Sequence, residues 1–283
     1  MTSATEGLLP VDKPSGITSH DVVDLVRKAL GVRKVGHAGT LDPMATGLLL
    51  MGVGRATRLL RFLGALDKEY EGVGRLGERT DTLDADGTVI ESSPVASSED
   101  EVGAAAAGLV GEIMQRPPAY SAVKVGGRRM YSVAREGGSV EAPPRPVRVD
   151  AFDIVGFDGR DFVFRVVCSG GAYVRVLVAE VGERLGSGAH LTRLRRTRIG
   201  GFRVEEASPP DLPDPVLPLD RAVAHLPSLP LDSEEEAIAA RHGRCLAPSG
   251  IDGPYGLRDP AGGLIGVWRD TGTKSCPEVV LGR

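Results

Sequence analysis

Residues 36–47 are the segment of this chain whose residue types and spacing best suit chemistry, and they read GHAGTLDPMATG. Pro43 biases Asp42 toward an extended backbone, and the glycines allow a ligand to approach the main chain closely. An aspartate presented in this way can act as a nucleophile. In isolation, however, a loop aspartate more often forms a turn or caps a helix, and a lone histidine such as His37 more often has a structural role.

A second group of carboxylates suggests a different chemistry. Residues 84–88 read DADGT, which resembles the motif of haloacid-dehalogenase-type phosphatases, in which the first aspartate is phosphorylated. That motif must end a buried apolar strand, whereas residues 79–83 read RTDTL and are largely polar. We therefore interpret this segment as a turn that approaches a hairpin. Phosphatase activity dependent on Mg²⁺ would reverse this interpretation.

The composition indicates an ordinary folded protein. The chain has 283 residues, of which 41% are hydrophobic and 25% charged, which is enough for a sizeable core and for more than one domain. The N-terminus lacks a basic start followed by an apolar stretch, and the longest apolar runs, such as residues 48–53, are too short to cross a bilayer. These features predict a cytoplasmic protein.

The chain contains three cysteines, Cys168, Cys245 and Cys276, and no C-x-x-C pair. This spacing suggests neither a disulfide framework nor a zinc site. The sequence therefore predicts reduced, structural cysteines and no bound metal.

Charge is distributed unevenly, although the formal net charge is only −4. Residues 116–148 hold seven basic and two acidic side chains, and residues 193–203 hold five arginines and no acid. Residues 205–236, by contrast, hold nine acids and one arginine. Such segregation suits a basic face that binds phosphates, although chance clustering on a solvated surface is an equal alternative.

The spacing of apolar residues and turn residues predicts a mixture of helices and strands. Ser19 is expected to cap a helix that ends at Gly31, and Ser98 with Glu101 forms a capping box before another helix. A further helix should follow the turn at residues 169–171. The expected strands are residues 8–12, 48–53, 68–76, 87–91, 147–157 and 162–168. Because strands and helices do not alternate regularly, we predict an α+β fold with a mixed, largely antiparallel sheet flanked by helices.

Two stretches interrupt this pattern. Residues 112–148 contain paired prolines and glycines, and we interpret them as a basic, partly helical insertion. Residues 209–218 are rich in proline and read as a linker. Short apolar runs beyond it, near 256–257, 264–267 and 279–281, predict a small, mostly β domain. The predicted division is therefore residues 1–215 and 216–283.

Several motifs, in order along the chain, resemble the TruB family of tRNA pseudouridine synthases. Residues 36–49 are similar to the family's G-H-x-G-T-L-D-P-x-A-T-G-L-L, residues 13–19 to its K-P-x-G-x-T-S, and residues 68–70 to its K-x-Y. Residues 117–124 resemble the start of its RNA-gripping insertion, and residues 173–175 with 185–191 resemble its last signature. The likeness fades after residue 203, where the family has a small PUA-type RNA-binding domain.

The resemblance implies the pseudouridine synthase fold and a role for each matching residue. Asp42 attacks the target nucleotide, Arg175 pairs with Asp42 and holds it ionised, and Tyr70 stacks on the uracil and helps to move the C5 proton. Taken without the resemblance, Tyr70 and Leu194 read as ordinary core residues. The substrate-binding positions that the resemblance implies are His37, Tyr173, Leu194, Lys13 and Lys124, with Lys13 as structural support.

The resemblance also implies the reaction, which is isomerisation of uridine to pseudouridine at position 55 in the T-loop of tRNA. The target uridine would be flipped out of its stack. No cofactor, guide RNA or membrane is implied, and the protein is expected to be a monomer. Two alternatives remain. An RNA-guided enzyme of the dyskerin type would share Asp42 but need protein partners, and a noncatalytic tRNA-binding factor would use the same basic surface. The basic insertion favours the stand-alone enzyme.

Overall fold

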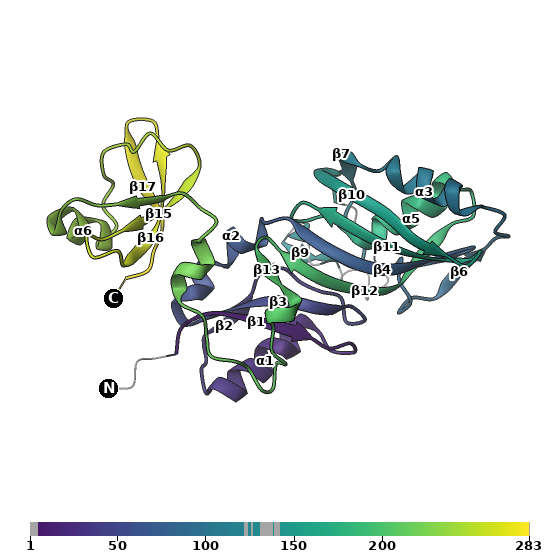
Figure 1. Cartoon of the computed structure of the whole chain (residues 1–283), viewed down its shortest axis with the longest axis horizontal. Coiled ribbons are helices and arrows are strands. Elements are labelled where there is room, and N and C mark those ends of the chain that lie inside the picture. Colours follow the sequence, from purple (N-terminus) through teal and green to yellow (C-terminus); the bar gives the residue numbers. More distant parts are fainter. Residues whose placement is uncertain (1–4, 122–123, 126, 131–137, 139–141, 283) are drawn as a thin grey trace.

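The computed structural model describes residues 5–121, 124–125, 127–130, 138 and 142–282. Figure 1 shows a large sheet that carries most of the helices and a separate small sheet near the C-terminus. The strands of the large sheet are β1 (Gly7–Lys13), β2 (Val35–His37), β3 (Thr46–Val53), β4 (Lys68–Leu76), β7 (Gly111–Gln115), β10 (Arg145–Phe157), β11 (Asp161–Cys168), β12 (Ala189–Ile199) and β13 (Phe202–Arg203). The small sheet contains β14 (Ser228–Pro230), β15 (Pro254–Arg258), β16 (Leu264–Thr271) and β17 (Lys274–Val280). The main helices are α1 (Ser19–Leu30), α2 (Leu60–Gly64), α3 (Glu99–Ala107), α5 (Val174–Arg184) and α6 (Glu234–Arg241).

The large sheet runs in the order β1-β3-β12-β4-β11-β10-β7, with β2 paired to β3 and β13 paired to β12. Every pairing in it is antiparallel except that of β12 with β3, which is parallel. The prediction of an α+β fold with a mixed, largely antiparallel sheet is confirmed. The parallel contact brings the start of β3, and the loop before it, against the middle of β12.

Alternate side chains of β3 pack into two different hydrophobic cores, as expected for a strand buried on both faces. Leu49 and Met51 pack with α1, while Leu48 and Leu50 pack with α2 on the other side. Helices α3 and α5 cover the opposite end of the sheet and share a third core with β4, β10 and β11. The site loop before β3 is therefore anchored in a sheet that is covered on both sides.

Helix α1 begins one residue earlier than expected. The hydroxyl of Thr18 accepts a hydrogen bond from the Asp21 amide, and the Asp21 carboxylate accepts one from the Thr18 amide, so Thr18 is the N-cap. The prediction of Ser19 as the cap is wrong, because the Ser19 hydroxyl bonds instead to the backbone of Leu41. The predicted end at Gly31, in a left-handed conformation, is confirmed.

The basic insertion is shorter than residues 112–148. Strands β7 and β10 are neighbours in the large sheet, so residues 111–115 and 145–157 belong to that sheet. The segment between them includes a hairpin of β8 (Lys124–Val125) and β9 (Arg128–Arg129). Residues 131–137 and 139–141 of this segment lie outside the described residues, so its partly helical character stays a prediction.

The proline-rich segment before the small sheet lies against β1 at both of its ends, through bridges that join Ser208 to Val11 and Leu217 to Leu8. Val267, Val279 and Leu281 of the C-terminal region share a core with residues of α2 and β3. The small sheet is therefore joined to the α2 side of the larger part by this shared core and by an ion pair between Arg61 and Glu278 (2.7 Å). The predicted division at residue 215 stays a prediction. No helix in the described ranges is long and apolar enough to span a membrane.

The prediction that all three cysteines are reduced is wrong for two of them. Cys245 and Cys276 form a disulfide across 31 residues of chain. A bridge between Leu246 and Ser275 brings the two cysteines together, and sequence spacing alone does not reveal this pairing. Cys168 is free, and burial raises the pKa of its thiol to about 12, so this cysteine is the inert core residue we expected.

Candidate active site

Asp42 lies in the loop between β2 and β3. A buried lysine of β1, Lys13, holds this loop by hydrogen bonds to its backbone. The Lys13 ammonium is fully buried and donates hydrogen bonds to the carbonyls of Pro43 (3.1 Å), Ala45 (2.7 Å) and Pro14 (2.9 Å). Desolvation lowers the pKa of Lys13 to about 8, while the charge of Asp42 acts in the opposite direction. Lys13 thus fixes the backbone that directly follows the aspartate.

A buried arginine holds the same loop from the side of β12. Arg196 is 1% exposed and donates to the carbonyls of Leu48 (2.7 Å) and Gly39 (3.1 Å). The loop then enters β3 at Gly47, where φ is +102° and a Cβ would lie 2.3 Å from the Arg196 carbonyl oxygen. Only glycine permits this approach. The loop is therefore tied to β1, β12 and, through Ser19, to α1.

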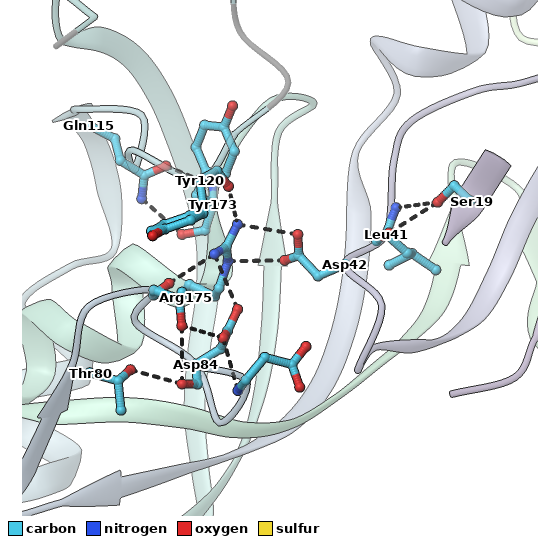
Figure 2. Close-up of polar contacts among 11 residues, drawn as sticks. Ser19, Leu41, Asp42, Thr80, Asp84, Gln115, Tyr120, Tyr173 and Arg175 are labelled. Carbon is cyan, nitrogen blue, oxygen red and sulfur yellow. Dashed lines mark hydrogen bonds and ion pairs between the residues drawn. The ribbon is translucent and has the colours of Figure 1, made fainter. Parts of the chain in front are cut away.

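Asp42 meets Arg175, which stands in the first turn of α5 (Figure 2). The distances are 3.0 Å from Arg175 Nε to Asp42 Oδ2 and 3.2 Å from Nη2 to Oδ1, so one guanidinium contacts both carboxylate oxygens. The side chain of Arg175 is 4% exposed and that of Asp42 is 32% exposed. The aspartate is thus held on one side and accessible on the other, as a nucleophile must be.

Arg175 also contacts a second carboxylate that our sequence analysis did not assign to the site. Asp84 Oδ2 lies 3.1 Å from Arg175 Nη1, and the carbonyls of Thr82 and Tyr120 accept hydrogen bonds from the guanidinium at 2.8 and 2.9 Å. Figure 2 shows Asp42, Asp84 and Tyr120 converging on Arg175. We had dismissed residues 84–88 as a turn approaching a hairpin. The hairpin of β5 (Glu78–Thr80) and β6 (Val89–Ser92) is confirmed, but its turn also carries this contact.

The turn that presents Asp84 is strained. Leu83 has φ of +63° and is the only residue other than glycine with a positive φ among those the structure describes. This conformation costs roughly 1–2 kcal/mol for a residue with a Cβ. A hydrogen bond from the Leu191 amide to the Leu83 carbonyl (3.0 Å) holds it. The strained backbone directs the Thr82 carbonyl and the Asp84 side chain toward Arg175, and strain of this kind is common at functional sites.

Burial raises the pKa of Asp42, and the charges of Asp84 and Asp86 raise it further. The guanidinium of Arg175 and the ammonium of Lys13 act in the opposite direction without offsetting the desolvation. The charge of Arg175 therefore favours the ionised form of Asp42, but the pKa of the carboxyl still lies above its ordinary value.

Two of the apolar positions implied by the resemblance lie together in one core. Tyr70 (6% exposed) and Leu194 (7% exposed) pack in the same cluster as Leu41, the residue before Asp42. Burial raises the pKa of the Tyr70 hydroxyl, and the Arg196 guanidinium lies 6.0 Å from the centre of the Tyr70 ring. Stacking of Tyr70 on a base stays a prediction.

The remaining predicted positions surround this core. Tyr173 precedes α5, with its backbone paired to the Gln115 side chain and its ring under Arg145 at 5.0 Å. His37 ends β2 beside the loop, and burial lowers the pKa of its imidazole. The backbone of Lys124 lies in β8, and its side chain lies outside the described residues.

Comparison with known proteins finds matches along nearly the whole chain. A family model described as "TruB family pseudouridylate synthase (N terminal domain)" matches residues 27–174, and one described as "tRNA Pseudouridine synthase II, C terminal" matches residues 227–282. A protein of Mycobacterium sp. (strain KMS) named tRNA pseudouridine synthase B is 49% identical over 97% of this chain and 96% of its own length. A protein of the same name from Mycobacterium tuberculosis (strain ATCC 25618 / H37Rv) is 43% identical over 99% of this chain and 97% of its own.

A solved structure titled "Crystal Structure of a Cbf5-Nop10-Gar1 Complex" contains a chain with a TM-score of 0.75 and 28% identity, covering 98% of this chain and 85% of that one. Fold, site loop and matched models together define an isomerase of the pseudouridylate synthase class, and the predicted fold is confirmed. Within that class, the chain belongs to the TruB family.

Proposed function

We propose that the protein isomerises uridine to pseudouridine at position 55 in the T-loop of tRNA, with Asp42 as nucleophile and without a guide RNA. The observation that carries the proposal is the pairing of a partly exposed Asp42 carboxylate with a buried Arg175, on a loop fixed from three sides. The name shared by relatives at 43–49% identity supports tRNA as the substrate.

The reaction requires the protein mainly to position the nucleotide and to hold an ionised carboxylate beside it. Asp42 attacks the flipped nucleotide, the C1′–N1 bond breaks, the uracil turns, and C5 bonds to C1′. The hydrogen on C5 is lost as a proton and N1 gains one, so the product is an isomer and no electrons leave. Flipping the uridine costs roughly a few kcal/mol, and Tyr70 and Leu194 would form the apolar wall that receives the base. Arg175 would keep the carboxylate aimed at the nucleotide throughout.

The likeness to a chain of the Cbf5-Nop10-Gar1 complex keeps a second candidate in view, the RNA-guided enzyme that works only with partner proteins. The higher identity to the tRNA pseudouridine synthases over nearly the full chain favours the stand-alone enzyme. Cytoplasmic location and a monomeric state remain predictions.

One experiment separates these candidates. Unmodified tRNA is incubated with the purified protein alone, and pseudouridine is mapped by mass spectrometry. We expect one modified site, at position 55. Product that appears only after a guide RNA and partner proteins are added would favour the guided enzyme, and binding without product would favour a noncatalytic factor.

The Asp42→Asn variant tests the nucleophile. Asparagine keeps the size of the side chain, and Arg175 retains Asp84 and two carbonyls as partners, so the fold should survive. Turnover should be abolished with tRNA affinity nearly unchanged. Turnover by this variant, in protein free of wild type, would remove Asp42 from that role.

A further inference from the structure

The arginines that we expected to form a basic face on β12 are largely neutralised. Arg195 pairs with Asp12 at 2.7 Å, Arg198 lies 3.5 Å from Glu69, and Arg196 is buried behind the site loop. Only part of this run is therefore free to bind phosphates. Cations that can contact an RNA backbone must be sought elsewhere on the molecule.

A pocket beside α1 and β2 contains such cations. Its volume is about 630 Å³, and no acidic side chain is among the described residues that line it. The basic residues that line it are His20, Arg27, Arg33, Lys34 and His37, and the others are Val23, Val35, Gly36, Thr57 and Leu60. A concave surface lined by one sign of charge concentrates ligands of the opposite sign.

The charges in this pocket are mostly unmatched. Arg33 and Lys34 are exposed, and neither side chain has an ion pair within the described ranges. Arg27 pairs with Asp24 at 2.9 Å, but its Nε is buried without a hydrogen-bond partner in that part of the chain, as is Nδ1 of His37. The pocket thus offers two free cations at its surface. Beneath them lie one arginine donor and one imidazole nitrogen, which donates or accepts according to its tautomer.

The pocket borders the strand that leads into the loop carrying Asp42. His37 both lines the pocket and ends the strand from which the loop departs. On the α1 side, His20 follows Ser19, whose hydroxyl bonds to both backbone groups of Leu41, the residue before Asp42. An RNA strand with one nucleotide at Asp42 would therefore pass close to these cations.

We propose that this pocket binds backbone phosphates of the substrate RNA next to the flipped uridine, with Arg33 and Lys34 as the principal contacts. The inference rests on the proposed function, and it names a surface that positions the RNA in addition to the basic insertion. The partner is the RNA backbone, because free cations on a concave surface match phosphates spaced along a strand and read no base sequence.

The test is the double variant Arg33→Gln/Lys34→Gln, measured by binding of a fluorescent T-arm stem-loop over a salt series. Each phosphate contact adds about 0.7–0.9 to the slope of log affinity against log salt, so the slope should fall by about 1.4–1.8. If this contribution vanishes at 1 M salt, affinity at 0.1 M salt should fall by about 25- to 60-fold. The single-turnover rate at saturating RNA should stay within about twofold of wild type.

Two controls keep the test specific. Arg33→Lys/Lys34→Arg keeps both charges and should bind as wild type does. Arg244→Gln/Lys274→Gln removes two exposed cations of the C-terminal region that have no ion pair among the described residues, and it should leave the slope unchanged. An unchanged slope in the first variant, an equal fall in this last one, or wild-type protein that does not bind the stem-loop would overturn the proposal. Tight binding by wild type without pseudouridine would instead refute the proposed function.

Discussion

The most informative single change is Asp84→Asn, because Asp84 contacts Arg175 and its side chain is almost fully buried. Asp84 Oδ1 accepts hydrogen bonds from the Thr82 hydroxyl (2.6 Å) and the Asp86 amide (3.2 Å), and Oδ2 faces Arg175. An asparagine oxygen can keep the first two bonds. Its amide group would then face the guanidinium, so a donor would meet a donor. The variant therefore removes one contact to Arg175 and leaves the turn intact.

The expected loss follows from the burial of the pair. The side chains of Arg175 and Asp84 are 4% and 6% exposed, so water does not screen their attraction. A contact between charged groups contributes about 1.5–3 kcal/mol. If this whole contribution stabilises the transition state by positioning Arg175 against Asp42, its loss raises the activation barrier by the same amount. At 1.36 kcal/mol per factor of ten, the rate then falls by about 10- to 160-fold. Arg175 keeps Asp42 and two carbonyls, so the loss should not approach that of Asp42→Asn.

Asp84→Asn should also shift the pH dependence of the single-turnover rate. A variant that is merely misfolded would lose rate without this shift. The negative charge of Asp84 raises the pKa of Asp42, so its removal should lower that pKa. The acidic limb of the single-turnover rate should then move to lower pH, even though the plateau rate is reduced. The assay uses tRNA that carries tritium at uracil C5, because the reaction releases that hydrogen.

Asp86→Asn is the matched control. It removes the same charge from an exposed position in the same turn, without a contact to Arg175. We expect a small shift of the acidic limb and a plateau within twofold of wild type. A plateau for Asp84→Asn within twofold of wild type, with the acidic limb unmoved, would refute the idea that Asp84 positions Arg175.

Three further predictions concern pH, the support of the loop and the disulfide. Because burial raises the pKa of Asp42 above the ordinary 3.8, the wild-type single-turnover rate should already decline on acidification above that pH, measured with RNA saturating throughout. Lys13→Met should lower this rate at least about tenfold with RNA affinity unchanged, since three carbonyls lose their donor. The folded pKa of Lys13, about 8, lies below its ordinary 10.5, so the unfolded chain binds more protons between these values and stability should rise with pH there; urea titrations should show a smaller rise in Lys13→Met. Cys245→Ser should lower the free energy of unfolding of oxidised protein by about 3–4 kcal/mol, given the sequence separation of 31 between the two cysteines, and should have no effect under reducing conditions.

Local sequence signals predicted most of the regular elements. Strand β4 coincides with the predicted residues 68–76, and the capping box of Ser98 and Glu101 is present. These features depend on neighbours close in sequence, which periodicity and capping residues reveal. The errors arose where a distant partner decides the outcome. Ser19 bonds to Leu41 and so leaves the cap to Thr18, and Cys276 meets Cys245 only because the intervening strands fold back.

The residues of the candidate site also fall into two groups, those that sequence motifs reveal and those that only the three-dimensional structure reveals. Asp42 and Arg175 could be named because their motifs resemble those of a family, but no local pattern links Asp84 to Arg175, 91 positions further on. The turn at Leu83 reads as an ordinary hairpin, and its positive φ is visible only in three dimensions. Contacts made through carbonyls, such as that of Tyr120, leave no trace in side-chain identity at all.

The buried cations behind the loop show why Asp42 can be both half-buried and reactive. Lys13, Lys68 and Arg196 come from three strands, and the hydrogen bonds they make in the described ranges are to backbone carbonyls rather than to carboxylates. Carbonyl dipoles satisfy the donors but do not cancel the charge, so a positive field remains beneath the loop. Of these three cations, Lys13 acts on Asp42 directly, and its charge opposes the desolvation that raises the pKa of Asp42. A carboxylate introduced among these cations would neutralise the field and raise that pKa further, so the absence of an acid partner for them in the described residues follows from the chemistry that Asp42 is proposed to perform.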